Sequence, residues 1–497
     1  MSKIGFDSEK YLAMQSERIL SRIDDFGGKL YLEFGGKLFD DFHASRVLPG
    51  FAPDNKIKLL QKLKDKAEIV IVINSSDIAK NKLRADLGIT YHDDVLRLID
   101  IFRSMDLYVG SIVISQFSKD NDNTAAIAFQ SKLEHLGIKV YRHYHIDGYP
   151  TAINHIVSDE GYGKNEYIET TRQLIVVSAP GPGSGKMATC LSQLYHEYKK
   201  GVKAGYAKYE TFPIWNLPLE HPVNKAYEAA TADLNDINMI DPWHYKAYNK
   251  ITVNYNRDVE IFPVLKILFQ KLMGFSPYQS PTDMGVNMAG FCISDDEVCC
   301  EASKQEIIRR YYKALVRKRK DSYSNKEAEK ILLLMEELGL KLSDRKVVPV
   351  ALEKARVTGK ACAAIELPDG TIVTGKTTPL MGYSSTILLN SLKVLAGIDD
   401  SLKLISPSAI EPIQKLKTEF LGSSNPRLHT DEVLISLSIS AATNDLAKLA
   451  MQQLPYLNGC QIHTTTILGS VDERVFRSLG LQVTSEPEYG TKKLYQK

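Results

Sequence analysis

Short β-branched and apolar runs alternate with segments of helical spacing over the first 200 residues. A run such as Glu68–Ile73 is typical of a strand that is buried on both faces. Repeated alternation of this kind predicts a doubly wound α/β domain, with a mostly parallel sheet and helices on both faces. The predicted strands are Leu30–Phe34, Glu68–Ile73, Tyr108–Ser115, Val140–Ile146 and Leu174–Ser178, and the predicted helices are Asn55–Lys66, Leu83–Phe102, Thr124–Leu136 and a segment from about Met187 to Lys200.

The pattern changes after about Gly201. The β-branched runs thin out, and helix-like segments dominate as far as about Leu342. This pattern predicts an α/β domain over residues 1–205, followed by a helical domain or insert over residues 206–344. The expected helices of this middle segment are Pro222–Leu234, Ile261–Met273, Ser303–Arg319 and Asn325–Leu338.

A further change follows Asp344. Pro368-Asp369-Gly370 lies between two strand-like runs, Ala361–Leu367 and Thr371–Thr374, and predicts a β-hairpin. A smaller C-terminal α/β domain is therefore expected over residues 345–497. Its other expected elements are a serine-capped helix Ser384–Leu395, a long helix Asp431–Gln452 and a strand Gln461–Ile467.

Composition narrows the classes of protein that this chain can belong to. With 497 residues it is long enough for two to four domains. The formal net charge of +2 argues against a nucleic-acid binder that works through bulk electrostatics. Apolar runs are far shorter than a membrane span, and the N-terminal residues do not read as a signal peptide. We expect a cytoplasmic protein without membrane or nucleic-acid partners, and homo-oligomer formation stays open.

The six cysteines follow no C-x-x-C spacing, and Cys299 and Cys300 are adjacent. We expect reduced thiols that pack as small apolar residues. The stretch Tyr195-His196-Glu197 contains the His-Glu pair that begins the H-E-x-x-H zinc motif, but Lys200 occupies the position of the second histidine. We therefore expect no bound metal.

The strongest candidate site is the glycine-rich string Pro180-Gly181-Pro182-Gly183-Ser184-Gly185-Lys186, between a predicted strand and a predicted helix. Glycines let backbone N–H groups converge on an anion, and a helix N-terminus adds free N–H groups and a positive dipole end. Gly181, Gly183, Ser184 and Gly185 would supply backbone donors, Lys186 would neutralise charge, and Thr189 is the nearest further hydroxyl. This pattern favours binding of a phosphate group.

The string departs from the P-loop pattern G-x-x-x-x-G-K-[ST] at two positions. Pro180 stands at the first glycine position, and Met187 stands where a hydroxyl would bind magnesium. A magnesium-dependent NTPase is therefore not expected. A glycine-rich turn that only permits tight packing remains the alternative.

Polar residues elsewhere are expected to lie near the loop. Asp77 and Asp147 come just after predicted strands, at the carboxyl edge where ligand sites gather in parallel sheets. Asp283 and Asn287 belong to a polar, proline-containing loop of the kind that often lines sites. All four are candidate ligand contacts.

The chain resembles a bacterial family catalogued as uncharacterised protein family 0371, a domain-of-unknown-function family. The resemblance rests on APGPGSGKMATCLSQLYHEY, ETFPIWNLPLEHPVNKAYEAATADLND and SPTDMGVNMAGF, and it covers essentially the whole chain. It implies a cytoplasmic bacterial protein with a large N-terminal region and a smaller C-terminal domain, and it brings no catalytic residue. Separately, the hairpin over residues 361–374 and the helix after it resemble the start of the cytidine-deaminase type of α/β fold, although the H-x-E and P-C-x-x-C zinc motifs of that family are absent.

The leading interpretation is a protein that binds a phosphorylated small molecule or a nucleotide at Gly181–Lys186, as an enzyme of unknown reaction and cofactor. The alternative is a non-catalytic regulatory or scaffold protein, in which the loop is structural or senses a metabolite. Fold alone does not decide between them.

Overall fold

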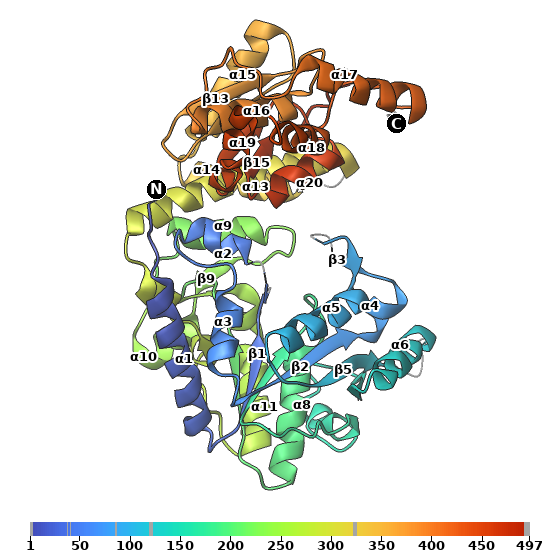
Figure 1. Cartoon of the computed structure of the whole chain (residues 1–497). Helices are drawn as coiled ribbons and strands as arrows, with labels where there is room; N and C mark the ends of the chain where they lie inside the picture. The colour runs from blue at the N-terminus through green and yellow to red at the C-terminus, as the bar shows by residue number, and fades with distance from the viewer. Residues whose placement is uncertain are drawn as a thin grey trace. The chain divides into compact units, whose positions relative to one another are not determined.

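The computed structural model describes residues 3–36, 38–39, 41–84, 87–118, 123–321 and 326–491 (Figure 1). The chain forms two compact units. The N-terminal unit consists of Ile4–Glu228 and Asn235–Ala302, and the C-terminal unit contains Ala229–Leu234 and the chain from Ser303 onward. Each unit is described by itself.

A seven-stranded sheet is the centre of the N-terminal unit, and every pairing in it is parallel. The strand order is β11-β8-β1-β7-β2-β5-β6. The strands are β1 (Leu30–Phe34), β2 (Ala67–Asn74), β5 (Val109–Phe117), β6 (Lys139–Tyr144), β7 (Leu174–Ser178), β8 (Gly205–Tyr209) and β11 (Gly285–Val286). The α/β class and the parallel sheet agree with the sequence-based prediction.

Burial explains why the central strands read as continuous apolar runs. Every residue of β1 and β7 is buried, and β2 is buried from Ala67 to Ile73. Such strands have helices on both faces, so neither face needs polar residues. β1 pairs with β7 from Leu30↔Leu174 onward, and with β8 from Leu30↔Gly205 onward.

The connections run in two directions from the centre of the sheet. The chain goes from β1 to β2, β5 and β6 toward one edge, then returns to β7 and goes to β8 and β11 toward the other edge. Since such crossovers are right-handed, the two series place their helices on opposite faces. The reversal between β1 and β7 is a topological switch point, where ligands bind in open α/β sheets.

Helices cover both faces of this sheet. The helices of the N-terminal unit are α1 (Ser8–Asp25), α2 (Phe42–Val47), α3 (Asn55–Lys62), α4 (Ser75–Ala79), α5 (Tyr91–Ser104), α6 (Thr124–His135), α7 (Ile153–Ile156), α8 (Lys186–Lys199), α9 (Pro222–Ala230), α10 (Pro242–Tyr248), α11 (Asn256–Met273) and α12 (Pro281–Met284). Short antiparallel pairs are formed by β3 (Leu83–Arg84) with β4 (Ile89–Thr90), and by β9 (Asn238–Ile240) with β10 (Val253–Tyr255). In the parts of the chain that the structure describes, no helix is both long and apolar enough to cross a membrane.

Two element predictions in this unit were wrong. The predicted helix Leu83–Phe102 begins only at Tyr91, because Gly88 adopts a positive φ of 71° and Thr90 caps the helix start. The strands β8 to β11 were not predicted, because Gly205–Tyr209 contains no β-branched residue and β9, β10 and β11 are only two or three residues long. β8 is nevertheless fully buried and pairs with β1 and β11.

α13 (Asp296–Asp321) belongs partly to each unit and, with α14 (Lys326–Glu337), forms the helical segment that precedes the C-terminal sheet. Both helices are expected from the sequence, although Asn325, the predicted start of the second, lies outside the described residues.

The mixed sheet of the C-terminal unit has the order β13-β12-β14-β15. Its elements are α15 (Val347–Thr358), β12 (Cys362–Glu366), β13 (Ile372–Lys376), α16 (Tyr383–Leu395), α17 (Pro407–Lys415), α18 (Thr430–Ser440), α19 (Asp445–Met451), β14 (Gln461–Thr464), α20 (Ser470–Ser478) and β15 (Gln482–Ser485).

The predicted hairpin is confirmed, as β12 and β13 pair antiparallel around Gly370. The single long helix expected over Asp431–Gln452 is instead two helices. Asn444 separates them, because its side chain accepts hydrogen bonds from the backbone of Leu446 and Ala447 and so starts α19. The expected serine cap of α16 is also absent: Gly382 is the N-cap, and Ser384 donates to Asp472 instead.

Candidate functional site

The glycine loop connects β7 to α8 at the switch point of the sheet. Gly183 and Gly185 have positive φ values of 76° and 92°, and Gly185 is the N-cap of α8. These conformations suit glycine because they crowd the Cβ of other residues. A Cβ at Gly181 would lie 2.2 Å from the Tyr91 hydroxyl, so this position also has no room for a side chain.

Side chains from β5 and β2 contact the carbonyl oxygens of the loop. Ser115 Oγ on β5 donates to the Ser184 carbonyl at 2.6 Å, and Asn74 Nδ2 at the end of β2 lies 3.4 Å from the Gly183 carbonyl. A planar trans peptide points its N–H opposite to its C=O. The N–H groups of Ser184 and Gly185 are therefore turned away from the strands that hold the loop.

The backbone N–H groups of residues 183–188 have no hydrogen-bond partner within the described ranges, and no side chain caps the start of α8. The first turn of any helix leaves such donors unpaired. Here the loop extends the series by further donors before the helix begins. Together with the positive end of the α8 dipole, they form an arrangement suited to an anion.

Lys186 and Thr189 add side-chain groups beside these donors. Lys186 is the first residue of α8 and is half-buried, and no ion pair or hydrogen bond of its ammonium is recorded with another described residue. Thr189 is 1% exposed, and its Oγ1 has no hydrogen-bond partner. Thr189 therefore offers a buried hydroxyl one turn behind the donors.

A second polar group lies at the carboxyl ends of β1 and β8, on the sheet face that α8 covers. Tyr31 of β1 donates to Glu197 of α8 at 2.7 Å. Glu33, two residues on, shares that face and accepts from the Tyr206 hydroxyl of β8 at 2.7 Å. Glu33 and Lys186 both act on the buried Cys190 thiol of α8: burial raises its pKa most, Glu33 raises it further, and Lys186 lowers it. This carboxylate and the loop lysine therefore lie within electrostatic reach of one side chain.

Three carboxylates, those of Glu33, Glu210 and Asp258, surround the ammonium of Lys208 in β8. Within the described residues it is the only ammonium in this group. We call these four residues the carboxylate–lysine cluster. Lys208 Nζ lies 2.7 Å from Glu210 Oε1 and pairs with Asp258 at the start of α11. Burial alone lowers the pKa of Lys208, but Asp258, Glu210 and Glu33 raise it, and the net shift is upward. Lys208 therefore stays protonated.

Three carboxylates around one ammonium leave negative charge in a buried place, which favours uptake of a proton. Burial raises the pKa of Glu210 to about 7, with Lys208 opposing and Asp258 and Glu33 adding to the rise. The Tyr255 hydroxyl donates to Glu210 Oε1 at 2.8 Å. Glu210 thus exchanges a proton near neutral pH, a property typical of a general acid or base.

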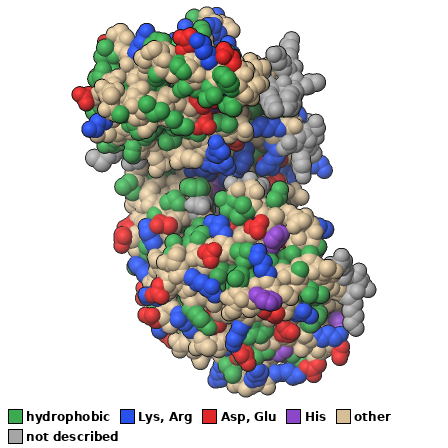
Figure 2. All heavy atoms as spheres, turned by 45° about the vertical axis from the view of Figure 1, so that its right-hand side comes forward, with side chains coloured by type: hydrophobic (Ala, Val, Ile, Leu, Met, Phe, Trp, Pro, Cys, Tyr) green, Lys and Arg blue, Asp and Glu red, His purple; other side chains and the backbone are tan. Residues whose placement is uncertain are grey.

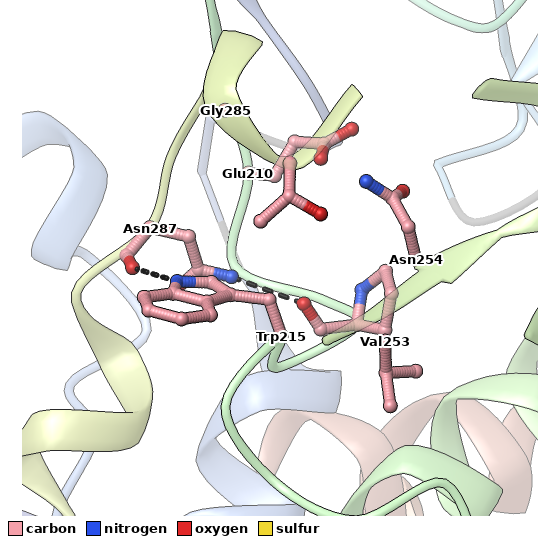
Figure 3. Close-up of a pocket in the computed structure, with 8 residues that line it drawn as sticks. Glu210, Trp215, Val253, Asn254, Gly285 and Asn287 are labelled. Atoms are coloured by element: carbon pink, nitrogen blue, oxygen red, sulfur yellow. Dashed lines mark hydrogen bonds between the residues drawn. The ribbon is translucent and has the colours of Figure 1, made fainter. Parts of the chain in front are cut away.

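Figure 3 shows a small cavity beside Glu210, into which the side chains of Glu210 and Asn254 point. Its volume of about 10 Å³ is room for a single water molecule. Tyr255 and Lys208 both contact Glu210 through Oε1. A larger cavity, of about 480 Å³, lies between α7 and α11 around His155 and Lys271. Neither of these two cavities is lined by a residue of the glycine loop.

The spacing between the loop and the carboxylate–lysine cluster follows from strand order. β7, which leads into the loop, and β8, which carries Lys208, both flank β1. Neighbouring strands lie about 4.8 Å apart, so the two groups are separated by roughly 10 Å along the carboxyl edge. A small phosphorylated molecule has this length.

The four other predicted contacts have different surroundings. Asp77 in α4 lies 3.2 Å from Lys82, whose ammonium lies over the Tyr91 ring beside Gly181. Asp147 follows β6, is 94% exposed at its side chain, and lies 3.5 Å from His145 Nε2. Asp77 is thus linked to the loop through two side chains, whereas Asp147 contacts His145.

Asp283 and Asn287 make contacts that hold their own segments. Asp283 forms a capping box with Ser280 at the start of α12. Asn287 is buried, donates to the Thr211 and Pro213 carbonyls, and accepts from Ala289. Asn287 lines the small cavity beside Glu210, whereas Asp283 contacts Tyr248 and Ser280.

The carboxylate–lysine cluster was not predicted from the sequence. Its members are separated along the chain and join only through the β1–β8 pairing and α11. The available signal was Lys208-Tyr209-Glu210, a run with two charges in a segment that is otherwise apolar and aromatic. Lysine and glutamate are rarely buried unless they are paired.

Two family models match this chain: domain of unknown function DUF1846, N-terminal, over residues 4–339, and its C-terminal counterpart over residues 343–495. A UPF0371 protein of Corynebacterium diphtheriae is 62% identical over 497 residues, covering 100% of both chains. The chain belongs to the UPF0371 family. Similar relatives include a UPF0371 protein of Corynebacterium urealyticum, 60% identical over 99% of both chains, and one of Streptococcus thermophilus, 58% identical over 100% of both.

These family descriptions carry no activity, so the function has to be argued from the site. The lower part of Figure 2 shows one face of the N-terminal unit, on which acidic and basic side chains are intermixed. This mixture agrees with the near-neutral net charge of +2.

Proposed function

We propose that this UPF0371 protein binds a phosphorylated small molecule, such as a nucleotide, with its phosphate on the loop Gly181–Lys186. The observation that carries the proposal is the series of unpartnered backbone N–H groups over residues 183–188, within the described part of the chain. Their position at the topological switch point and the charge of Lys186 support it.

The chemistry of such a site follows from what lies around it. Met187 follows the lysine, so the loop lacks the hydroxyl that binds magnesium in P-loop NTPases. Glu210, held between Tyr255 and Lys208, supplies a group that gains and loses a proton near neutral pH. We infer an enzyme in which the loop binds the phosphate and the carboxylate–lysine cluster transfers a proton. In the alternative, a sensor, the same loop binds a metabolite without turnover.

The C-terminal unit supports a finer fold assignment in the same proposal. A β-hairpin, β12 and β13, begins its four-stranded mixed sheet, and α16 follows the hairpin. This arrangement is compatible with the cytidine-deaminase type of α/β fold. The zinc motifs of that family are absent from the sequence, so we assign no deamination to this unit.

Calorimetric titration with inorganic phosphate, then with a panel of nucleotides and sugar phosphates, tests the binding proposal. Lys186→Ala should weaken binding by about 10- to 150-fold, since a charge-assisted hydrogen bond contributes about 1.5–3 kcal/mol. The melting temperature should barely change. Lys132→Ala, at an exposed lysine of α6, is the matched control.

Equal affinities of the wild type and Lys186→Ala for every ligand that binds would contradict the proposal. A wild type that binds none of the panel would also overturn it. Turnover assays on whichever ligand binds would then separate the enzyme from the sensor.

A further inference from the structure

Three side chains with metal-binding atoms converge in the N-terminal unit, away from the glycine loop. They are His221, in the residue before α9, and Asp296 and Cys300, one turn apart at the start of α13. His221 Nε2 lies 3.0 Å from Asp296 Oδ1 and 3.5 Å from Cys300 Sγ, and Cys300 Sγ lies 3.8 Å from Asp296 Oδ2. We propose that His221, Asp296 and Cys300 form a zinc-binding site.

The distances between these atoms suit a tetrahedral ion. Zinc binds sulfur at about 2.3 Å and nitrogen or carboxylate oxygen at about 2.0–2.2 Å, so tetrahedral ligand atoms lie roughly 3.2–3.7 Å apart. The three observed separations fall within a few tenths of an ångström of this range. A metal ion can therefore be accommodated by small side-chain movements, without a change in the backbone.

The chemistry of the three ligands selects the metal class. A thiolate, an imidazole and a carboxylate together favour Zn²⁺ over Mg²⁺ or Ca²⁺, which prefer oxygen ligands. Ionised Cys300 and Asp296 carry two negative charges, which a divalent ion neutralises. Three protein ligands leave one tetrahedral position for water or a substrate atom, as in catalytic zinc sites.

A further carboxylate lies beside the site: Asp295 is the residue before α13, and its Oδ1 accepts a hydrogen bond from the Val298 N–H. The carboxylates of Asp295 and Asp296 offset the positive dipole end of α13, which by itself disfavours a cation. The His221 side chain is only 10% exposed, so one ligand is already fixed, while Asp296 is 60% exposed and keeps the site accessible.

One hydrogen bond opposes metal binding. The Val223 N–H donates to His221 Nδ1 at 3.2 Å, which places the proton of the neutral ring on Nε2. Zinc on Nε2 would move this proton to Nδ1 and break the bond. The loss of one such helix-capping bond weakens binding by about fivefold, which is small beside the affinities of zinc sites.

This proposal goes against our expectation of no bound metal, which rested on cysteine and histidine spacing. The ligands follow a pattern of one histidine, then an aspartate 75 residues later, then a cysteine four residues after that. No short zinc motif has this spacing. Only the packing of the chain before α9 against the start of α13 brings the three residues together.

The test uses the full-length protein after chelation and dialysis. Co²⁺ titration should give a sulfur-to-cobalt charge-transfer band with one equivalent per chain, and Zn²⁺ should displace the cobalt. Cys300→Ser should abolish that band, and both it and His221→Ala should weaken zinc binding by at least about tenfold. Glu297→Gln, at an exposed acidic residue of the same helical turn, should bind zinc like the wild type.

Circular dichroism and thermal melting of each variant separate a lost ligand from a lost fold. Cys300→Ser is close in shape to the native residue, and it should melt like the wild type without metal. The absence of stoichiometric Co²⁺ or Zn²⁺ binding would overturn the proposal. A charge-transfer band that persists in Cys300→Ser would do the same, because the sulfur would then belong to another cysteine.

Discussion

Ser115 Oγ, on β5, donates a hydrogen bond of 2.6 Å to the carbonyl oxygen of Ser184 in the glycine loop. The two residues are 69 positions apart: Ser115 lies in β5 and Ser184 in the loop after β7, and β2 lies between these two strands. The bond fixes the peptide between Ser184 and Gly185. It thereby directs the Gly185 N–H away from the sheet, toward the proposed anion.

Replacing Ser115 by alanine should weaken phosphate binding without unfolding the protein. The variant loses one neutral hydrogen bond, which contributes about 0.5–1.5 kcal/mol, so affinity should fall about two- to tenfold. Ser104→Ala, which removes an exposed hydroxyl from α5, is the control. Isothermal titration with inorganic phosphate measures both variants, and equal affinities would show that Ser115 does not position the loop.

Alanine at Gly185 should impair the loop more than alanine at Gly183. Both glycines have positive φ, so each substitution costs about 1–2 kcal/mol of backbone strain. A Cβ at Gly185 would also lie 3.1 Å from Ser115 Oγ, whereas a Cβ at Gly183 meets nothing within 4 Å. Urea unfolding and phosphate titration of the two variants should show similar destabilisation, with the larger affinity loss for Gly185→Ala. The reverse order of affinities would contradict this account of the loop.

Stability should depend on pH through Glu210. Its pKa is raised from 4.5 to about 7, first by burial, with Lys208 opposing and Asp258 and Glu33 adding. A group whose pKa is raised on folding stabilises the protein below its unfolded pKa, and this contribution is lost as pH rises through the folded value. The wild type should therefore lose up to about 3 kcal/mol between pH 4.5 and 7 relative to Glu210→Gln.

Urea unfolding of both proteins at pH 5, 6, 7 and 8 measures this difference. The comparison isolates Glu210, because every other titrating group is shared, including Tyr255, Tyr227, Asp236 and Arg257 near the carboxylate–lysine cluster. Parallel stability curves over this range would mean that Glu210 is ionised throughout.

A C-terminal fragment should be more stable when it begins at Ser303 than when it begins at Arg345. The longer fragment retains Tyr312 of α13, whose hydroxyl donates to Glu486 at 3.1 Å and whose ring lies 5.0 Å from that of His463. Thermal melts of fragments 303–497 and 345–497 compare them. Equal melting temperatures would support the domain boundary near residue 344 that we predict from the sequence pattern.

Much of the fold follows from periodicity. Strands such as β2 and β7 were predicted because a strand buried on both faces must be apolar throughout. β8 was missed because its burial depends on aromatic residues and on Lys208, whose charge only its partners make tolerable. The break between α18 and α19 was missed because Asn444 caps a helix inside a segment that is otherwise helical in pattern.

The candidate site was predictable only where it is continuous in sequence. The glycine loop is one segment, and its strand–loop–helix setting was predicted. The carboxylate–lysine cluster and the His221, Asp296 and Cys300 group are assembled from distant segments. Tertiary packing brings these side chains together, so the spacing of residues along the chain does not predict either group.

The strand order also determines when the sheet can be completed during synthesis. Both neighbours of β1 come much later in the chain: Leu174, which pairs with Leu30, follows it by 144 residues, and β8 comes later still. At about 5–20 residues per second, the ribosome needs on the order of 10 s to reach β7. Throughout this interval the apolar strand Leu30–Phe34 has emerged without its hydrogen-bonding partners. We therefore expect the nascent chain to be prone to aggregation until the segment that carries the glycine loop has been made.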